Sequence, residues 1–336
     1  MSLSVGINGA GRIGRALLRH LSTDSKVRVV AVNELADAAA IAHLLQYDSV
    51  HGRFPAAVAA PHDDSLQLGD RSIAFLRHSD PAEIPWQAHG VDLVVEATGR
   101  FATGDDARRH LRVGPRRVLV SAVCPGADAT VVLGIHAAHL PDSARVVSAA
   151  SCTTHAAALP LSLLQRWYGL AAAEVTTVHC TTGSQVTIDA PHTDWRRGRS
   201  ALVSMIPTTT TAVTGLAEAI PSLAGRITCL AIRVPTAAVS LVEIVAQTLA
   251  PLDSIEQLRN RFRAAAEGEL QGLLGTSDEP LVSIDFKSDP RSSIIDLPLT
   301  VNAGSHLVRV FAWYDNEWGY SQRIADLLRL WEGIGI

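Results

Sequence analysis

The sequence predicts a two-domain α/β protein, with a parallel sheet in the first domain and a mostly antiparallel sheet in the second. Two observations support this fold class. In the first half, short apolar β-branched runs alternate with segments of helical periodicity, which is typical of βαβ units. After Ser148 the expected strands become longer and alternate apolar with polar residues, which favours an α+β domain on an antiparallel sheet. We expect domains over 1–150 and 151–317, with a last helix, 318–336, joining the first domain.

The first half gives its elements in a regular order. The expected strands are apolar runs: Ser4–Gly9, Val27–Asn33, Ile73–Arg77, Val91–Thr98, Arg117–Ser121 and Thr130–Gly134. The expected helices have apolar residues three and four apart: Arg12–Leu21, Ala36–Leu45 and Asp105–Leu111.

The second half begins with a helix after Cys152. Its expected strands are Glu174–His179, Ile227–Val234, Leu241–Thr248, Leu281–Phe286 and His306–Tyr314. The further expected helices are Ala212–Ile220, Ile255–Glu267 and Tyr320–Leu330. A long polar loop, Thr182–Arg199, lies between the first two strands.

Composition excludes several classes of function. The 336 residues are 47% hydrophobic and 18% charged, with a net charge of −4 and interspersed signs, so neither nucleic acid nor an anionic membrane is expected as a partner. The four cysteines are too few for a disulfide framework and too far apart for a structural zinc site, so no metal is expected. No secretion signal is expected from the first residues, and the richest apolar stretch, Ala156–Leu164, is interrupted by Pro160. These features predict a cytoplasmic protein.

A glycine-rich turn between the first strand and the first helix predicts a dinucleotide site. Gly9 permits the tight turn, Gly11 lets the backbone approach a pyrophosphate, and Gly14 lets helix and strand pack closely. The second expected strand runs into Glu34, twenty residues after Gly14, where an acid can bind the adenosine ribose. The pattern predicts a Rossmann-type domain, and an acid at this place favours NAD over NADP.

A cysteine and a histidine form a candidate nucleophilic site. Cys152 follows Ser151 just before a helix, where the positive end of the helix dipole is expected to lower the thiol pKa. His179 ends a strand and would activate the thiol if the fold brings the two together. A lone Cys is more often a small buried hydrophobe and a strand-end His is more often structural, so spacing alone leaves both interpretations open.

Several further segments, in order along nearly the whole chain, carry a resemblance to a known family. They are Asn8–Arg15, Tyr47–Phe54, Ala150–Thr154, Arg233–Thr236 and Trp313–Tyr320. In these segments the chain resembles the glyceraldehyde-3-phosphate dehydrogenases. The resemblance implies NAD-dependent oxidation of glyceraldehyde 3-phosphate to 1,3-bisphosphoglycerate, with inorganic phosphate as co-substrate.

The resemblance also implies a role for individual residues. Cys152 matches the nucleophile that carries the thiohemiacetal and thioester, His179 matches the base, Asn316 matches the residue that holds the nicotinamide carboxamide, and Tyr320 lies beside that ring. Family positions around the rest of the cofactor are Arg12, Ile13, Glu34, Arg77, Thr98 and Ser121.

Two anion sites are implied in the same way. Thr182 and Arg233 match the site for the phosphate of the substrate. The site for attacking inorganic phosphate is matched by Ser151, Thr153, Thr210 and the backbone of Thr211. The Thr182–Arg199 loop matches a segment that packs on the cofactor of a neighbouring subunit, which implies a homotetramer.

The chain departs from the family at several positions close to these motifs. They are Ala149, His155, Ala156, His136, Thr211 and Ala238. Drift is one explanation. Another is an erythrose-4-phosphate dehydrogenase, which hydrolyses its acyl-enzyme, and a third is a non-catalytic scaffold protein. Thr211 replaces a glycine, so if it must adopt a positive φ we expect a looser phosphate site and a raised KM for phosphate.

Overall fold

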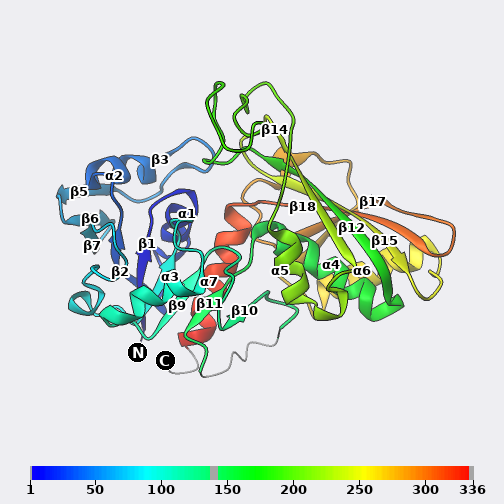
Figure 1. Ribbon diagram of the computed structural model, residues 1–336, viewed down its shortest axis with the longest axis horizontal. Coiled ribbons are helices and arrows are strands. Elements are labelled where there is room, and N and C mark those ends of the chain that lie inside the picture. The colour runs from blue at the N-terminus through cyan, green and yellow to red at the C-terminus, as the bar shows by residue number, and fades with distance from the viewer. Residues whose placement is uncertain (1, 137–142, 333–336) are drawn as a thin grey trace. The chain divides into compact units, whose positions relative to one another are not determined.

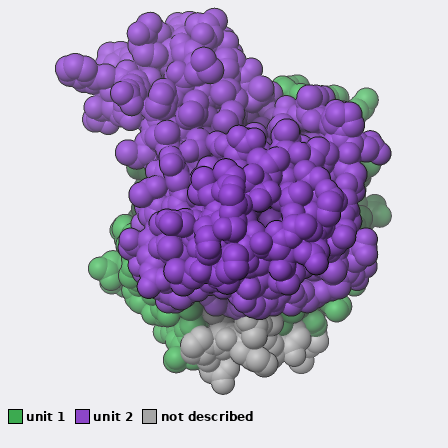
Figure 2. Space-filling model, turned by 90° about the vertical axis from the view of Figure 1, so that its right-hand side faces the viewer, with its two compact units in different colours: residues 1–131, 138–150, 321–336 green, residues 132–137, 151–320 purple. Residues whose placement is uncertain are grey.

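The computed structural model describes residues 2–136 and 143–332. Its contacts divide the chain into two compact units, which are coloured separately in Figure 2. Unit 1 falls within Met1–Val131, Ala138–Ala150 and Ser321–Ile336, and unit 2 within Val132–Ala137 and Ser151–Tyr320. Residues 333–336 of the expected last helix lie outside the described residues.

Unit 1 is built on a nine-stranded sheet in the order β10-β11-β9-β8-β1-β2-β7-β6-β5 among the residues described. Its strands are β1 (Leu3–Asn8), β2 (Val27–Asn33), β5 (Val58–His62), β6 (Ser65–Leu68), β7 (Arg71–Leu76), β8 (Leu93–Glu96), β9 (Arg117–Val120), β10 (Ala129–Thr130) and β11 (Val146–Ser148). The strands from β10 to β7 are parallel, and β6 and β5 continue the sheet antiparallel. A separate two-stranded ribbon pairs β3 (Tyr47–Asp48) with β4 (Gly52–Arg53).

The helices of unit 1 follow its strands, as Figure 1 shows for α1 after β1. They are α1 (Arg12–Leu21), α2 (Ala38–Gln46), η1 (Trp86–His89), α3 (Gly104–Arg108) and η2 (Arg109–Val113), with α7 (Trp318–Glu332) entering the unit at Ser321. The chain adds β2 and β7 on one side of β1 and then returns to add β8 on the other. Ligands of open parallel sheets bind at such a reversal, at the carboxyl ends of the strands.

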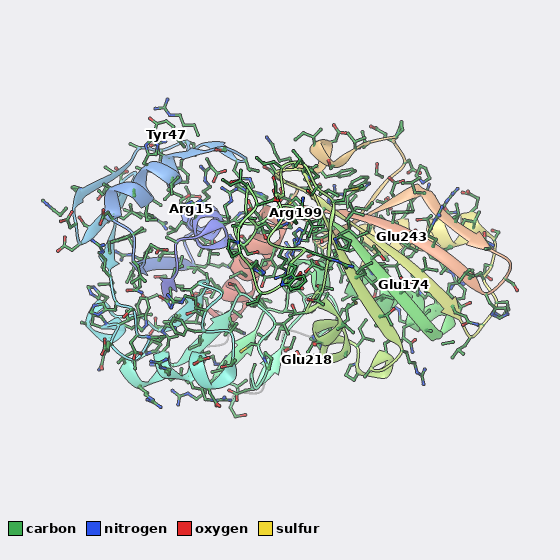
Figure 3. The ribbon with its side chains drawn as sticks, turned by 45° about the horizontal axis from the view of Figure 1, so that its top comes forward. Arg15, Tyr47, Glu174, Arg199, Glu218 and Glu243 are labelled. Carbon is green, nitrogen blue, oxygen red and sulfur yellow. The ribbon has the colours of Figure 1, made fainter. Side chains whose placement is uncertain are left out.

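Unit 2 contains a seven-stranded mixed sheet in the order β13-β14-β12-β15-β18-β17-β16. The strands are β12 (Leu170–Cys180), β13 (Ile206–Thr208), β14 (Ile227–Val234), β15 (Ser240–Thr248), β16 (Leu274–Ser277), β17 (Ser293–Ala303) and β18 (Leu307–Tyr314). Among the described residues, four of its six strand pairings are antiparallel, and β12 with β14 and β16 with β17 are parallel. Glu174 on β12 and Glu243 on β15 mark two neighbouring strands in Figure 3.

The helices of unit 2 are α4 (Cys152–Tyr168), α5 (Ala212–Ala219) and α6 (Ile255–Glu267), with the short turns η3 (Pro221–Leu223) and η4 (Ser283–Phe286). Helix α4 packs on β12, β15, β17 and β18, and Figure 1 shows α4, α5 and α6 on one side of the sheet. Its inward residues include Leu159, Leu161 and Leu163, all buried. The predicted fold class, a Rossmann-type domain with a mostly antiparallel second sheet, is confirmed.

Some individual elements differ from the prediction. The expected strand Leu281–Phe286 is wrong, because Asp285 accepts a hydrogen bond from Val282 N (2.8 Å) and closes a 3₁₀ turn there. The strand of this region is β17 instead. Its register slips between Asp296 and Val301, around Pro298, and a proline within a run argues against a strand in sequence-based prediction.

Three other boundaries are corrected. The expected helix Asp105–Leu111 is a short α3 followed by the 3₁₀ turn η2, and the expected strand Thr130–Gly134 is reduced to β10, Ala129–Thr130. Helix α2 begins at Ala38 and not at Ala36, because Asp37 has extended backbone angles at the N-cap. The β5–β6 hairpin was not predicted at all.

Candidate active site

The glycine turn after β1 forms a cradle in unit 1. Gly9 has φ 98°, and a Cβ there would lie 2.8 Å from Thr98 N, whereas a Cβ on Gly14 would lie 2.0 Å from Gly9 O. Neither position can carry a side chain without moving backbone. A Cβ on Gly11 would meet nothing within 4 Å, so its backbone faces open space at the start of α1. This is the arrangement that a pyrophosphate needs, with helix N–H groups exposed and no side chain in the way.

The cradle opens into a cavity of about 210 Å³ whose lining comes entirely from unit 1. Its walls include Asn8, Asn33, Glu34, His78 and Thr98. Glu34 accepts hydrogen bonds from Ala10 N (2.9 Å, Oε2) and Leu35 N (2.7 Å, Oε1), which anchor its carboxylate beside the turn. The residues present therefore fit an adenosine diphosphate group, with an acid placed to accept from a ribose hydroxyl.

The other cofactor positions of unit 1 have partners within the unit. Arg12 pairs with Asp48 at 2.5 Å. Burial alone would raise the pKa of Asp48, but hydrogen bonds from His51 N and from Arg12 lower it to about 2. Arg77 is exposed, pairs with Asp37 (2.7 Å) and donates to Leu35 O.

Two further predicted cofactor positions, Ile13 and Ser121, also lie in unit 1. Ile13 is half-buried in the first turn of α1, and Ser121 Oγ donates to Glu96 O at 3.0 Å. Of the predicted cofactor residues in unit 1, those at the cavity are Gly9, Gly11, Glu34 and Thr98.

A buried polar cluster behind the turn was not predicted. Glu96 accepts from Asn8 Nδ2 (2.6 Å), from Thr98 N (2.8 Å) and from the Thr98 hydroxyl, and contacts His110 Nε2 at 3.0 Å. Trp86 Nε1 can only donate, and it donates to His110 Nδ1 (3.0 Å), so Nε2 of His110 carries the proton that Glu96 accepts. The polar residues Asn8 and Glu96 at the ends of otherwise apolar strands were the signal that could have found this cluster.

The thiol and the imidazole of the predicted nucleophilic site meet in unit 2. Cys152 is the first residue of α4, whose N-cap Ser151 accepts from Thr154 N at 3.1 Å, and His179 lies near the end of β12. Cys152 Sγ lies 3.6 Å from His179 Nε2. His179 Nδ1 lies 2.8 Å from Cys180 O, which can only accept, so Nδ1 carries the proton and Nε2 presents a lone pair to the sulfur.

Burial is the largest influence on the pKa of both groups. Burial raises the pKa of the Cys152 thiol, against the lowering effects of the Arg233 charge and the Thr153 hydroxyl. Burial and then the Arg233 charge lower the pKa of His179 to about 3. The backbone N–H groups of Cys152 and Thr153 at the helix N-terminus do lower the thiol pKa, as expected, but desolvation of the thiolate outweighs them and the net shift is upward.

Hydroxyl groups surround this pair. Thr153 Oγ1 lies 3.0 Å from Tyr314 OH, which also lies 2.8 Å from Thr177 Oγ1, and the Tyr314 ring meets the His179 ring edge-on with centroids 6.0 Å apart. Arg233 donates weakly to Cys180 O (3.4 Å). The fold thus brings Cys152, Thr153, His179 and Arg233 into one cluster.

The other predicted phosphate residues bond within their own turns. Thr182 contacts Gln185 and Ser184, and Thr210 Oγ1 accepts from Ala212 N at 3.1 Å. Thr211 is the N-cap of α5 with φ −79° and ψ 0°. The condition for strain at Thr211, a positive φ, is therefore not met.

Asn316 and Tyr320, predicted at the nicotinamide, are both buried in unit 2. Asn316 Oδ1 accepts from Cys180 Sγ (3.0 Å) and Ser240 Oγ (3.2 Å). Burial raises the pKa of Tyr320 well above its usual value, and the ring packs edge-on against His155, with centroids 5.8 Å apart. His155, one of the departures from the family, thus packs against a residue predicted at the nicotinamide.

Two features of the described residues bear on other functions. Within 2–136 and 143–332, no helix has both the length and the apolarity to cross a bilayer. The same part of the chain holds no group of three or more His, Cys, Asp or Glu side chains arranged to bind a metal ion.

The doubly wound sheet with its glycine cradle, together with a match to the NAD-binding domain of a dehydrogenase family, identifies this chain as an NAD-dependent dehydrogenase. The profile described as "Glyceraldehyde 3-phosphate dehydrogenase, NAD binding domain" matches residues 3–104, and the profile of the C-terminal domain of the same family matches residues 151–316. The chain belongs to the glyceraldehyde-3-phosphate dehydrogenase family.

Similar proteins support the same assignment over nearly the full length. Glyceraldehyde-3-phosphate dehydrogenase 1 of Bacillus cereus is 44% identical over 324 residues, which cover 96% of each chain. The glyceraldehyde-3-phosphate dehydrogenases of Geobacillus stearothermophilus and Pseudomonas aeruginosa are 43% and 46% identical, each over 97% of both chains.

Proposed function

We propose that this chain oxidises glyceraldehyde 3-phosphate with NAD and inorganic phosphate to give 1,3-bisphosphoglycerate and NADH. The observation that carries the proposal is the 3.6 Å approach of Cys152 Sγ to the free lone pair of His179 Nε2. A thiol beside a neutral imidazole of fixed tautomer is an activated nucleophile with its base. Unit 1 would be the NAD-binding domain and unit 2 the catalytic domain.

The first step joins the aldehyde to Cys152. The sulfur bonds to the aldehyde carbon while its proton moves to His179 Nε2, and the carbonyl oxygen takes up that proton to give a thiohemiacetal. Bound NAD supplies the hydride acceptor. As the hydride leaves the carbon with two electrons, His179 takes the hydroxyl proton, and a thioester on Cys152 remains.

The second step releases the acyl group to phosphate. An oxygen of inorganic phosphate bonds to the thioester carbon, the C–S bond breaks, and Cys152 recovers its proton from His179. The net reaction releases one proton, which comes from phosphate. Ser151, Thr153, Thr210 and the backbone N–H of Thr211 would bind the attacking phosphate, and Thr182 with Arg233 would bind the phosphate of the substrate.

The backbone of Thr211 supports the phosphate-dependent reaction. Because its φ is −79°, a threonine occupies this position without strain, and the reason for expecting a raised KM for phosphate is removed. Titrating phosphate while following NADH formation from glyceraldehyde 3-phosphate tests the proposal, with a saturable dependence as the expected result. A rate independent of phosphate, with free acid as product, would identify the hydrolytic alternative. Absence of NADH formation with either aldehyde would favour a scaffold protein.

Cofactor choice would rest on Glu34. Its carboxylate, anchored by two backbone N–H groups, would accept from the 2′-hydroxyl of NAD and repel the 2′-phosphate of NADP. A kcat/KM ratio near one for the two cofactors would contradict this role. The cofactor contacts proposed in unit 2 are Asn316 and Tyr320.

A homotetramer in the cytoplasm completes the proposal. The segment from Thr182 to Met205 carries large apolar side chains that are mostly exposed, namely Ile188, Trp195, Leu202, Val203 and Met205. Arg199 marks this segment in Figure 3. Apolar residues gathered on a loop indicate a protein contact, and packing on a neighbouring subunit would cover them. Sedimentation at micromolar concentration tests the tetramer.

A further inference from the structure

The carboxamide of Asn316 is held by two donors that the catalytic steps do not use. Its oxygen accepts from the Cys180 thiol at 3.0 Å and from the Ser240 hydroxyl at 3.2 Å. All three side chains are almost fully buried, with exposed fractions of 4% for Asn316, 0% for Cys180 and 2% for Ser240. In this environment each polar group needs its partner, because an unsatisfied one is costly.

The sheet brings the two donors together. Cys180 is the last residue of β12 and Ser240 the first of β15, and these antiparallel neighbours pair Val178 with Leu241 at that end. Ser240 Oγ also accepts from Cys180 N at 3.2 Å. Its hydroxyl proton is thereby left to point at Asn316, and the two donors form one unit.

The backbone around these residues is equally constrained. Val239, directly before Ser240, has φ 65°, a left-handed conformation that is strained for a β-branched residue. Asp315, directly before Asn316, accepts from the backbone N–H groups of Ser288, Glu317 and Trp318 at 2.8–3.0 Å. Both the main chain and the side chain of Asn316 are therefore fixed.

The Cys180 thiol remains a donor under ordinary conditions. Burial raises its pKa to about 12, so the S–H group persists at neutral pH. A thiolate would repel the Asn316 oxygen instead. Flipping the amide would turn its NH₂ group toward Ser240 Oγ, which already accepts from the main chain, and toward a thiol that needs an acceptor.

We propose that Cys180 and Ser240 are positioning residues that lock the Asn316 carboxamide with its NH₂ group available to the nicotinamide carboxamide. The inference rests on the proposed function, in which Asn316 binds that group. A fixed NH₂ donor admits one orientation of the nicotinamide carboxamide and so selects one face of the ring. Cys180 and Ser240 touch neither substrate nor cofactor in this role.

The test compares binding of NAD with binding of ADP-ribose, which lacks the nicotinamide, by titration calorimetry. Cys180→Ala and Ser240→Ala should each weaken NAD binding about fivefold, the usual effect of one lost hydrogen bond, and leave ADP-ribose binding unchanged. Cys180→Ser should restore NAD affinity, because a hydroxyl also donates. The matched control is Cys229→Ala, a half-buried thiol on β14 that should alter neither ligand.

The outcomes separate this inference from the proposed function. Suppose that Asn316→Ala lowers the affinity for NAD but not for ADP-ribose. If the Cys180→Ala, Ser240→Ala double variant then leaves the ratio of the NAD and ADP-ribose affinities unchanged, the positioning role is wrong. If Asn316→Ala itself leaves that ratio unchanged, the assignment of Asn316 to the nicotinamide fails, and the inference fails with it. Should Ser240→Ala not fold, the comparison of Cys180→Ala with Cys180→Ser decides the question.

Discussion

Two polar clusters of this protein differ in how completely their groups are bonded. In unit 1, Glu96 accepts from Asn8, Thr98 and His110, and His110 is itself fixed by Trp86. In unit 2, Cys152 Sγ and His179 Nε2 lie 3.6 Å apart. The lone pair of Nε2 therefore faces a thiol, which is only a weak hydrogen-bond donor. A saturated cluster holds a shape, whereas a group left with a spare lone pair can accept a proton. In the proposed function, the first cluster supports the glycine cradle and the second carries out the chemistry.

The largest effect should come from removing the sulfur of the second cluster. Cys152→Ser should nearly abolish aldehyde oxidation while leaving NAD binding and the melting temperature almost unchanged, because a hydroxyl is a far weaker nucleophile than a thiol. Steady-state NADH formation and calorimetric NAD binding measure the two properties. Cys124→Ala provides the matched thiol control in unit 1. Substantial residual activity in Cys152→Ser would contradict the assignment of the nucleophile.

Removing the base should have the next largest effect. His179→Asn should slow both iodoacetate alkylation of Cys152 and hydride transfer by roughly 10²–10⁴-fold, the usual scale for loss of a general base. Alkylation is followed by mass spectrometry near neutral pH, and hydride transfer by single-turnover absorbance. An unchanged alkylation rate would refute the pairing of thiol and imidazole.

The saturated cluster should respond in stability. Glu96→Gln keeps the shape but replaces one oxygen by an NH₂ group facing a donor, so the free energy of unfolding should fall by about 2 kcal/mol. NAD affinity should fall too, because Asn8 adjoins the cradle. Urea unfolding measures the first effect. Glu174→Gln, exposed on β12, is the matched control and should change stability by less than about 0.5 kcal/mol. Equal effects of the two substitutions would remove the contrast between the clusters.

The pH dependence of stability tests the buried, neutral state of His179. Below its ordinary pKa of 6.5 the unfolded chain binds a proton on this imidazole, whereas the folded protein does not until about pH 3. The free energy of unfolding should therefore fall with falling pH in this window, by about 1.4 kcal/mol per pH unit from this group. His179→Asn should lose stability less steeply in urea unfolding at pH values across the window. Parallel slopes for the two proteins would mean that His179 is protonated in the folded state.

The smallest effect is expected at Thr211. With φ −79° and no side-chain hydrogen bond at its cap position, Thr211→Gly should change the free energy of unfolding by only a few tenths of a kcal/mol. The KM for phosphate should stay the same within error. A clear fall in that KM would show that the threonine perturbs the phosphate site after all. Phosphate titrations of both proteins measure this.

Sequence patterns predicted the parts of the fold that local periodicity determines. The parallel strands around β1, the helix after Cys152 and the glycine turn were all recognisable, because each has a hydrophobic period or a steric requirement of its own. Strand β17 was missed because Pro298 interrupts its pattern. The strand continues past this break by pairing with β18 on both sides of it. Strand β5 was missed as well, because a short, largely exposed hairpin strand leaves little hydrophobic signal.

Some features of the candidate site were likewise predicted from the sequence, and others were not. Cys152 and His179 were named from spacing and resemblance, but the tautomer of His179 depends on Cys180 O, and the Glu96 cluster depends on residues up to 88 positions apart. The lowering effect of the helix terminus on the thiol pKa was predicted, but burial, a property of the whole fold, outweighs it and makes the net shift upward. Contacts between distant segments have no signature in a local pattern.

The left-handed backbone at Ala150 and Ser288 has a consequence for protein engineering. Ala150, with φ 52°, directly precedes Ser151 and Cys152, and Ser288, with φ 65°, supplies the N–H group that Asp315 accepts. Glycine adopts these angles without strain, so substitution to glycine relieves the folded state at both positions. Because glycine also raises the conformational entropy of the unfolded chain, the net gain in heat resistance should be small at either position. The same substitutions would loosen the segments that carry the proposed nucleophile and Asn316, so an engineer who seeks thermal tolerance should keep both residues as they are.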